Sequence, residues 1–222
     1  MRGRFITFEG GEGTGKSTHA ALLAARIKSF GIGTLLTREP GGSAGAEIMR
    51  YILLSGAVRP LGANAEAVLF AAARDDHLTT LIRPALEQGK WVVCDRFADS
   101  TRIYQGVAGK VDPLAIKAME RIIVGETKPD LTFILDVPVK EGMKRAAARR
   151  GKGDADRFEA EAVAFHEKLR DGFLTLAGNE PQRCVLIDST LPKEEVSEQI
   201  WRVVIKKLDP ASAPIQFEDA AS

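Results

Sequence analysis

The amino-acid sequence predicts an α/β fold: a doubly wound, five-stranded parallel sheet with helices on both faces. First, five short β-prone runs alternate along the chain with longer stretches of helical periodicity, which is the order that builds a parallel sheet. Second, these runs are almost continuously apolar, as in strands that are covered on both faces. Third, a glycine-rich turn follows the first run directly, at the carboxyl end of a strand, where such sheets bind ligands.

The first predicted strand is the run Phe-Ile-Thr-Phe at residues 5–8, and the first predicted helix covers residues 17–30. Apolar residues recur there at the spacing of one helical face: Ala21, Leu22, Ala25 and Phe30. The other strands are expected at residues 34–37, 91–95, 131–137 and 184–188. The other helices are expected at residues 44–55, 65–88, 112–125, 139–150, 159–177 and 193–208. This order brings Arg38, Asp95 and Asp136 to one edge of the sheet.

The length, charge and apolar content of the chain limit the classes of protein to which it can belong. The chain has 222 residues and a formal charge of +1, which suits one well-packed domain and lacks the basic excess of a nucleic-acid-binding protein. No stretch approaches the ~18 apolar residues of a membrane span, and no apolar signal region precedes the first strand. We therefore expect a cytoplasmic protein without membrane or nucleic-acid partners. A single domain is expected over residues 1–208, and residues 209–222, rich in Ala, Pro, Ser and acidic residues, are expected to form a flexible tail.

The segment from Gly10 to Ser17 reads Gly-Gly-Glu-Gly-Thr-Gly-Lys-Ser, a complete phosphate-binding P-loop. The strand and helix that the motif requires are both predicted, which disfavours a chance glycine-rich turn. The glycines let main-chain N–H groups face a β-phosphate, and the helix start adds its positive dipole end. Lys16 should reach the β- and γ-phosphates, and the Ser17 hydroxyl should ligate Mg²⁺. The expected ATP-binding residues are Gly10, Gly11, Glu12, Gly13, Thr14, Gly15, Lys16, Ser17 and Thr18.

The strand predicted at residues 91–95 ends with Asp95 and is followed by Arg96. Hydrolytic P-loop proteins commonly place an acidic residue after this aspartate to activate water, whereas this chain has a cation there. Asp95 can support Mg²⁺ or its water shell, and Arg96 can pair in bidentate fashion with a second phosphate. A phosphate pocket for ATP combined with guanidinium groups for another phosphate suits transfer between two nucleotides.

Three further segments are distinctive besides the P-loop: Thr-Arg-Glu-Pro-Gly-Gly at 37–42, Leu-Phe-Ala-Ala-Ala-Arg at 69–74 and Asp-Arg-Phe-Ala-Asp-Ser-Thr-Arg-Ile-Tyr-Gln-Gly at 95–106. In these segments the chain resembles the bacterial thymidylate kinases, which transfer the γ-phosphate of ATP to dTMP. The resemblance covers nearly the whole chain, to about Leu208. It implies a P-loop NTPase fold of the nucleotide kinase type, ATP and dTMP as substrates, dTDP formation in dTTP synthesis, Mg²⁺ as cofactor and a homodimer.

Phe70 and Arg74 lie four residues apart on a predicted helix and so share a face, where one can stack on a base and the other can read its edge. Arginine offers only donors, which favours a carbonyl at the pyrimidine 4-position over the amino group of cytosine. Without the resemblance, a core phenylalanine and a solvated arginine are the alternative.

The resemblance also implies roles on the acceptor side. Tyr104 would lie near the 2′ position of the sugar and disfavour a ribose, and Thr101 would contact the base. A capping or surface role for Ser100 and Thr101 stays open. Arg38 and Arg96 would hold the acceptor phosphate from two sides. The expected substrate-binding residues are Glu12, Arg38, Phe70, Arg74, Arg96, Ser100, Thr101, Tyr104 and Gln105.

Glu12 is acidic within a loop built for anions, which predicts that it faces the acceptor. The resemblance implies that it contacts the acceptor's 3′-hydroxyl or orders Mg²⁺ and water. It also implies a lid over about residues 145–156 that supplies a cation, with Arg150 the first candidate and Arg149 the second. From sequence alone, a solvated charged face is the alternative. The expected catalytic residues are Lys16, Arg96, Arg150, Arg149 and Glu12, and the expected metal ligands are Ser17 and Asp95.

Two other functions share parts of this pattern. One is a P-loop kinase for another nucleotide or for a deoxynucleoside, although an acceptor without a 5′-phosphate would leave Arg38 and Arg96 unpaired. The other is a nucleotide-dependent switch or regulatory ATPase, which would bind nucleotide tightly without acceptor-dependent ADP production. The Asp95-Arg96 pair and the lid cations disfavour the switch.

Overall fold

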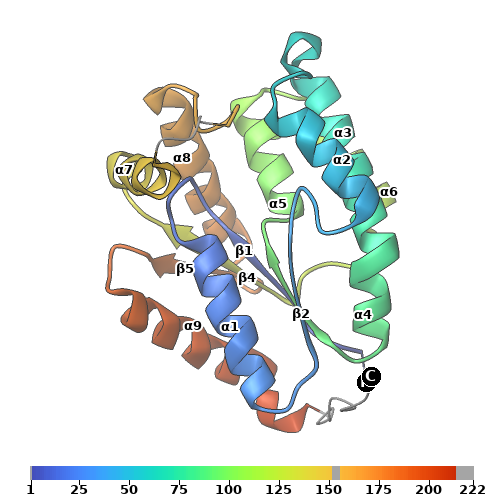
Figure 1. The fold of residues 1–222 in the computed structure, drawn as a ribbon, viewed down its shortest axis with the longest axis vertical. Coiled ribbons are helices and arrows are strands. Elements are labelled where there is room, and N and C mark those ends of the chain that lie inside the picture. The colour runs from blue at the N-terminus through green and yellow to red at the C-terminus, as the bar shows by residue number, and fades with distance from the viewer. Residues whose placement is uncertain (1, 152–155, 214–222) are drawn as a thin grey trace.

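The structure is a computed structural model that describes residues 2–151 and 156–213. Its centre is a sheet of five strands: β1 (Phe5–Glu9), β2 (Thr34–Arg38), β3 (Trp91–Asp95), β4 (Leu131–Asp136) and β5 (Cys184–Asp188). They lie in the order β2-β3-β1-β4-β5, and every neighbouring pair is parallel. The predicted five-stranded parallel sheet, flanked by helices, is confirmed (Figure 1).

Helices connect the strands and flank the sheet. They are α1 (Lys16–Ser29), α2 (Ala44–Leu54), α3 (Gly62–His77), α4 (Arg83–Glu87), α5 (Ala98–Thr101), α6 (Pro113–Ile123), α7 (Val139–Arg150), α8 (Val163–Asn179) and α9 (Lys193–Leu208). Two π-helical segments continue helices: η2 (Leu78–Ile82) joins α3 to α4, and η3 (Arg102–Ala108) extends α5. Short 3₁₀ turns are η1 (Arg59–Leu61) and η4 (Pro210–Ser212).

The predicted helices differ from the observed ones in three places. The helix expected at residues 65–88 begins earlier, at Gly62, and its α-helical part is interrupted by the π-helical segment η2. The helix expected at residues 159–177 begins later, at Val163, because the Asp156 carboxylate accepts the N–H groups of Phe158 and Glu159 at 2.8 and 2.9 Å and shapes a turn there. The helical segment at residues 98–108, made of α5 and η3, was not predicted as an element. Its polar start and π-helical continuation give no regular apolar stripe at a spacing of 3.6 residues.

The alternating side chains of β1 pack into two separate cores. Ile6 and Phe8 lie on the face covered by α1 and α9. Phe5 lies on the opposite face with η2 and α4. Each large apolar side chain buried in this way stabilises the fold by roughly 1.5–3 kcal/mol. Because both faces are covered, the strands read as continuous apolar runs.

The strands end together at one edge, where β1 leads into the P-loop and α1. In the register of the sheet, Arg38 at the end of β2 lies beside Asp95 at the end of β3, and Phe8 of β1 lies on the other side of Asp95. Asp136 ends β4 at the same edge, beside Asp188 of β5. The predicted meeting of the strand ends is therefore observed.

Two predicted segments extend beyond the described part of the chain. Residues 152–155 of the expected lid and 214–222 of the expected tail lie outside the described residues. The described residues after α9 form the turn η4. Among the described helices, none combines the length and the apolar character that crossing a bilayer requires.

Candidate active site

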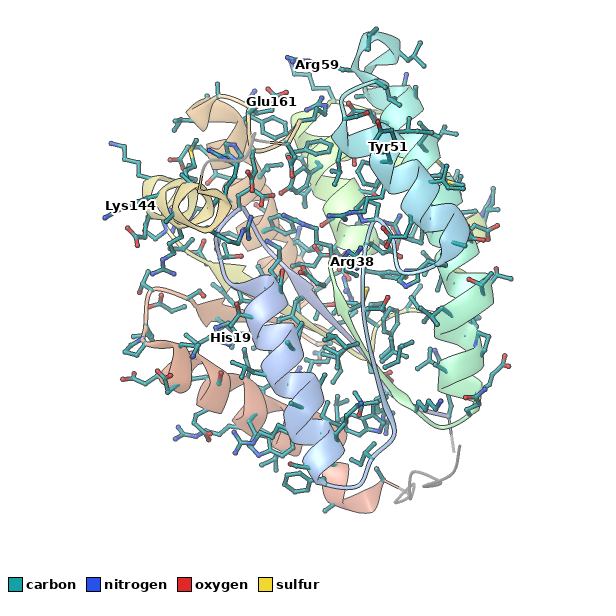
Figure 2. All side chains as sticks on the ribbon, viewed as in Figure 1. His19, Arg38, Tyr51, Arg59, Lys144 and Glu161 are labelled. Atoms are coloured by element: carbon teal, nitrogen blue, oxygen red, sulfur yellow. The ribbon has the colours of Figure 1, made fainter. Side chains whose placement is uncertain are left out.

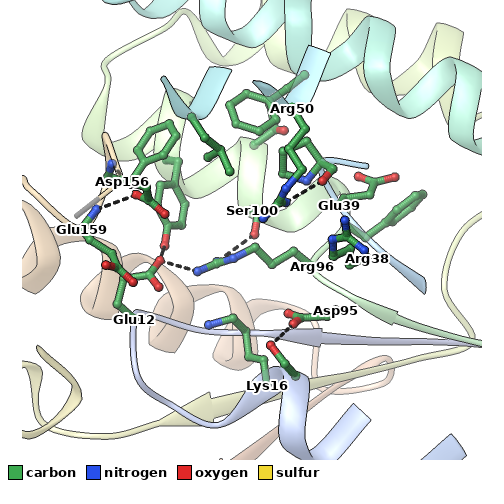
Figure 3. A pocket seen from close by; sticks show the side chains of 18 of the residues that line it. Glu12, Lys16, Arg38, Glu39, Arg50, Asp95, Arg96, Ser100, Asp156 and Glu159 are labelled. Atoms are coloured by element: carbon green, nitrogen blue, oxygen red, sulfur yellow. Dashed lines mark hydrogen bonds and ion pairs between the residues drawn. The ribbon is translucent and has the colours of Figure 1, made fainter. Parts of the chain in front are cut away.

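A pocket opens at the carboxyl edge of the sheet beside the P-loop (Figure 3). Its walls come from the ends of β2 and β3, from α2 and α3, from α5 with η3, and from both sides of the expected lid. Predicted site residues that line it are Glu12, Lys16, Ser17, Arg38, Phe70, Arg74, Asp95, Arg96, Ser100, Thr101, Tyr104, Gln105 and Arg149. The other predicted residues are Arg150 and the P-loop residues Gly10, Gly11, Gly13, Thr14, Gly15 and Thr18, which are not among the described lining.

Lys16 is buried and curls back over the P-loop. Its Nζ atom donates to the carbonyl oxygen of Gly11 at 2.6 Å and to the Thr14 Oγ1 atom at 3.4 Å. Burial, and then the nearby Arg96 guanidinium, lower the pKa of Lys16 to about 8. A buried ammonium among neutral acceptors gains from an anionic partner, so the loop is suited to receive a phosphate.

The two predicted metal ligands contact each other. The Ser17 hydroxyl, in the first turn of α1, donates to the Asp95 Oδ2 atom at the end of β3 (Figure 3). Both groups offer oxygen donors, which is the ligand type that Mg²⁺ prefers. This hydrogen bond therefore joins the P-loop helix α1 to β3, the strand next to β1.

The P-loop packs directly on helix α7. Gly13 has a left-handed backbone (φ 68°), and a Cβ atom there would overlap the carbonyl group of Gly142 in α7. A Cβ atom on Gly142 would in turn overlap the carbonyl oxygen of Glu12. Two facing glycines thus allow main chain to rest on main chain, at the base of the helix that leads into the expected lid.

Arg96 adopts an unusual backbone conformation next to the P-loop. Its φ of 69° lies in the left-handed region, which costs a residue with a side chain of order 1–3 kcal/mol and persists only where neighbours hold it. Its Nη2 atom donates to Glu12 Oε1 at 2.6 Å, and its Nη1 atom donates to the carbonyl oxygen of Gly10 at 3.1 Å. Burial disfavours its charge, but Tyr104 and Glu12 outweigh burial and hold its pKa above the usual value.

Glu12 faces this arginine and the wall of the pocket. Its Oε1 atom accepts from Arg96 and from the Tyr104 hydroxyl, the latter at 2.9 Å. Burial alone would raise the pKa of Glu12, but Arg96 and then Lys16 outweigh it and lower the pKa to about 2. The carboxylate is therefore ionised at any physiological pH.

One wall of the pocket combines Phe70 with Arg74, the pair predicted to share a helical face. Arg74 is buried and donates from Nε to Glu39 Oε2 at 2.7 Å and from Nη2 to Thr101 Oγ1 at 3.1 Å. Nη2 also donates to the carbonyl oxygen of Phe97 at 3.1 Å. These contacts fix the guanidinium, so that a planar donor group is held still beside an aromatic ring.

Two further arginines border the pocket near the end of β2. Arg38 is half exposed, and its Nη2 atom pairs with Glu47 Oε1 at 2.8 Å. Arg50 donates from Nη1 to the carbonyl oxygen of Pro40 at 2.7 Å, and burial and the nearby Arg38 lower its pKa. Two guanidinium groups that repel each other in a pocket are a fitting partner for a phosphate dianion.

Both lid arginines that were predicted are held by one carboxylate. Arg149 Nη2 pairs with Glu159 Oε1, and Arg150 Nη1 pairs with Glu159 Oε2, each at 2.8 Å. Arg149 lines the pocket and contributes to lowering the pKa of Glu12, whereas Arg150 is not among the described lining residues. Lys144, earlier on α7, points away from the pocket into solvent (Figure 2).

Several residues of the site were missed from sequence. Glu39 and Arg50 line the pocket. The only sequence feature that could have indicated them is the segment 37–42, which contains Glu39 and precedes Arg50. Phe158 closes the pocket over Phe70 and Tyr104, with ring centroids 6.1 and 5.4 Å apart. Its ring could not be placed because the turn that carries it was predicted as the edge of a loop.

Comparisons with known proteins give one consistent result. The family model for thymidylate kinase matches residues 8–200. A thymidylate kinase from a Bradyrhizobium species is 60% identical over 212 residues, which are 96% of this chain and 94% of that protein. A thymidylate kinase from Nitrobacter winogradskyi is 60% identical over 201 residues, 90% of this chain and 87% of that protein. The crystal structure of thymidylate kinase from Ehrlichia chaffeensis is similar with a TM-score of 0.74 and 32% identity, covering 92% of this chain and 100% of that one.

Proposed function

The chain belongs to the thymidylate kinase family of ATP-dependent phosphotransferases, which make dTDP and ADP from dTMP and ATP, and we propose how its residues divide this work. The observation that carries the proposal is the pocket in which the P-loop lysine, Lys16, and the guanidinium of Arg96 border the same space. One cation belongs to the donor loop and the other to a wall that receives a second phosphate.

On the donor side, residues 10–18 bind the triphosphate of ATP. Main-chain N–H groups at the start of α1 face the β-phosphate, and the helix dipole adds a positive end. Lys16 exchanges the Gly11 carbonyl for phosphate oxygens, because an anion is a stronger partner for a buried ammonium than a neutral carbonyl.

Magnesium is the proposed cofactor. Ser17 and Asp95 would hold it from the protein side, and the proposal is supported by their mutual contact, which brings two oxygen donors together. Such an ion takes most of its remaining ligands from phosphate oxygens and water. When bound, Mg²⁺ supplies neutralisation of charge on the transferring phosphate.

On the acceptor side, Arg38 and Arg96 bind the phosphate of dTMP, and Arg50 adds a third cation at the same wall. Phe70 stacks on the thymine, and Arg74 donates to its 4-carbonyl. Contacts with the described residues engage Nε and Nη2 of Arg74, so that Nη1 remains for the base.

The remaining acceptor residues lie on α5 and η3. Ser100, Thr101 and Gln105 line the pocket with polar groups, and the buried Gln105 Nε2 atom has no partner among the described residues. We propose that Gln105 donates to the nucleotide, since a buried amide gains from a partner. Tyr104, buried and tied to Glu12, crowds the 2′ position and selects a deoxyribose.

The chemistry needs no general base. The second pKa of a phosphate monoester is about 6, so the attacking oxygen of dTMP is already largely ionised at neutral pH. The protein brings two anions together and spreads the charge of the moving phosphoryl group through Lys16, Arg96 and a lid arginine. Closure of the lid also excludes water, which would otherwise accept the phosphoryl group. We assign the lid role to Arg149, and its position in the lining of the pocket supports this choice.

A homodimer in the cytoplasm is the proposed state of the protein, with residues 1–208 as one domain. Adjacent helices α2, α3 and α6 expose large apolar side chains, namely Ile48, Tyr51, Val68, Leu114 and Ile122. Helix α3 packs against both α2 and α6 (Figure 1), and Figure 2 labels Tyr51 on α2. A second copy of the chain is the occupant we propose for this surface.

An ADP-release assay with ATP, Mg²⁺ and a panel of nucleoside monophosphates tests the function. We expect ADP formation that depends on dTMP and is much slower with dCMP and with ribonucleotides. ADP formation without an acceptor would indicate an ATPase. A preference for an acceptor without a 5′-phosphate would contradict the roles of Arg38 and Arg96.

A further inference from the structure

Glu9, the last residue of β1, is a fully buried carboxylate that no part of the mechanism uses so far. Its Oε1 atom accepts the N–H of Phe97 at 2.8 Å and the N–H of Ser100 at 3.2 Å. Its Oε2 atom accepts the Ser100 hydroxyl at 2.6 Å. All three donors come from the loop and first turn that follow β3. The carboxylate therefore ties the strand before the P-loop to the segment that carries Arg96.

The main chain of Arg96 is held on both sides by the end of β1. Its own N–H donates to the carbonyl oxygen of Phe8 at 2.9 Å, and the next N–H, that of Phe97, donates to Glu9. Between these two hydrogen bonds lies the left-handed backbone of Arg96. A strained residue keeps its conformation only where its surroundings fix it, and here two adjacent residues of one strand do so.

The side chain of Arg96 is linked to the same carboxylate. Its Nη1 atom donates to Ser100 Oγ at 3.3 Å, and the Ser100 hydroxyl donates to Glu9 Oε2. A hydroxyl that donates to a carboxylate is a better acceptor for the next donor in the chain. Glu9 thus acts on the guanidinium through Ser100 and on the backbone through Phe97.

We propose that Glu9 is a positioning residue for the acceptor phosphate: it holds Arg96 in the conformation that receives dTMP without itself touching either nucleotide. The inference rests on the proposed role of Arg96. It is independent of which lid arginine acts.

The surroundings of Glu9 argue against a role in stability alone. The charged and titratable groups around it are Asp99 on α5, Arg96 on the loop, Lys16 on α1 and Cys94 on β3. Burial, and then Asp99, raise the pKa of Glu9 to about 7, so that the folded chain bears a cost when this acid ionises. A neutral side chain of equal size would avoid this cost, which favours a functional reason for the carboxylate.

The test is a double-mutant cycle with Glu9→Gln and Arg96→Ala. Calorimetry measures the affinity for dTMP of the unaltered chain, of each single variant and of the double variant. Glu9→Gln keeps the volume and removes the charge. We expect about tenfold weaker dTMP binding from Glu9→Gln in the unaltered chain, the size of losing a charged hydrogen bond. In the Arg96→Ala background we expect less than about a twofold effect, because the group that Glu9 positions is gone. ADP affinity should stay within about twofold in every variant.

The matched control is Asp130→Asn. The Asp130 carboxylate also accepts a main-chain N–H of β1, that of Phe5 at 2.7 Å, but at the far end of the strand. Its replacement should leave dTMP affinity unchanged. If Glu9→Gln does not fold, Glu9→Asp shortens the side chain that reaches Phe97 and Ser100 and should show the same dependence on Arg96.

Equal weakening of dTMP binding in both backgrounds would overturn the inference, and so would unchanged dTMP binding. These outcomes are distinct from a failure of the proposed function, which would appear as absent dTMP-dependent ADP formation in the unaltered chain.

Discussion

The Tyr104 hydroxyl donates a hydrogen bond to Glu12 Oε1 at 2.9 Å, and this contact joins the wall of the acceptor pocket to the P-loop. The same carboxylate oxygen accepts from Arg96 at 2.6 Å, and the guanidinium of Arg96 lies 5.0 Å from the centre of the Tyr104 ring. Three side chains from three segments therefore form one charged and aromatic unit. In this unit the Tyr104 hydroxyl contacts Glu12, whereas the Tyr104 ring contacts Arg96, so the two parts of the side chain can be tested separately.

Tyr104→Phe should lower kcat/KM for dTMP by roughly tenfold, because the Glu12 carboxylate loses the hydrogen bond from the Tyr104 hydroxyl and keeps that from Arg96. The preference for dTMP over ribothymidine monophosphate should persist, because the ring that crowds the 2′ position remains. Tyr104→Ala should weaken that preference as well. Steady-state kinetics with both acceptors measure the two effects, and an equal change of the preference in both variants would contradict this division.

Arg149→Ala should reduce turnover by about 10³-fold, the loss expected when a cation that stabilises the moving phosphoryl group is removed. Arg150→Ala should have a much smaller effect, because Arg149 borders the pocket and Arg150 is not part of its described lining. Lys144→Ala, on the exposed side of the same helix, is the control and should leave turnover unchanged. If Arg150→Ala lowered turnover more than Arg149→Ala, Arg150, the first candidate from the sequence, would be the lid cation.

Arg74→Gln should reduce the preference for dTMP over dCMP by about tenfold or more, since glutamine can accept as well as donate at the base edge. The change also removes a buried partner of Glu39, which His77 still contacts at 3.2 Å. The melting temperature and ADP affinity of the variant therefore serve as controls. An unchanged ratio of kcat/KM for the two acceptors in a folded variant would show that the base is read elsewhere.

The stability of Glu9→Gln should depend less on pH than that of the unaltered chain. The pKa of Glu9 is raised from 4.5 to about 7 in the fold, first by burial and then by Asp99. A raised pKa means that the contribution of protonated Glu9 is complete below about pH 4.5 and is lost as the pH rises through about 7. Glutamine cannot ionise and avoids this loss.

Melting temperatures at about pH 5.5 and about pH 8 measure this effect. Relative to the unaltered chain, Glu9→Gln should gain a few degrees at the higher pH. Asp130→Asn should not show this gain. If the melting temperatures of Glu9→Gln and of the unaltered chain changed equally between the two pH values, ionisation of Glu9 would not lower the stability of the fold.

Ile122→Asp should dissociate the proposed homodimer, because it places a charge in the apolar surface of α2, α3 and α6. Ile205→Asp is the control: it makes the same change at a half-exposed isoleucine on α9, outside this surface, and should leave the assembly intact. Light scattering coupled to size-exclusion chromatography gives the molar mass of each. A monomeric unaltered chain would contradict the homodimer itself.

The fold was predictable because its signals are local. The strands are short apolar runs, and the P-loop lies in sequence between its own strand and helix. Phe70 and Arg74 were paired correctly because four residues on a helix fix their relation. Glu9, Arg50 and Phe158 were missed because each acts on residues far away in the chain.

The lid arginines and the helical segment 98–108 were also not predictable from local sequence signals. The sequence analysis ranked Arg150 before Arg149, whereas in the structure Arg149 lines the pocket and Arg150 is not among the described lining residues. The helical segment 98–108 was overlooked because its π-helical part does not repeat at 3.6 residues. Its position is fixed instead by hydrogen bonds to a strand that is distant in sequence.

The facing glycines of the P-loop and α7 have a mechanical consequence. With no side chain between Gly13 and Gly142, there is nothing compressible to absorb a displacement of either backbone. The separation of the loop and the root of α7 is therefore set by main-chain atoms alone, and neither backbone can move toward the other unless the other yields.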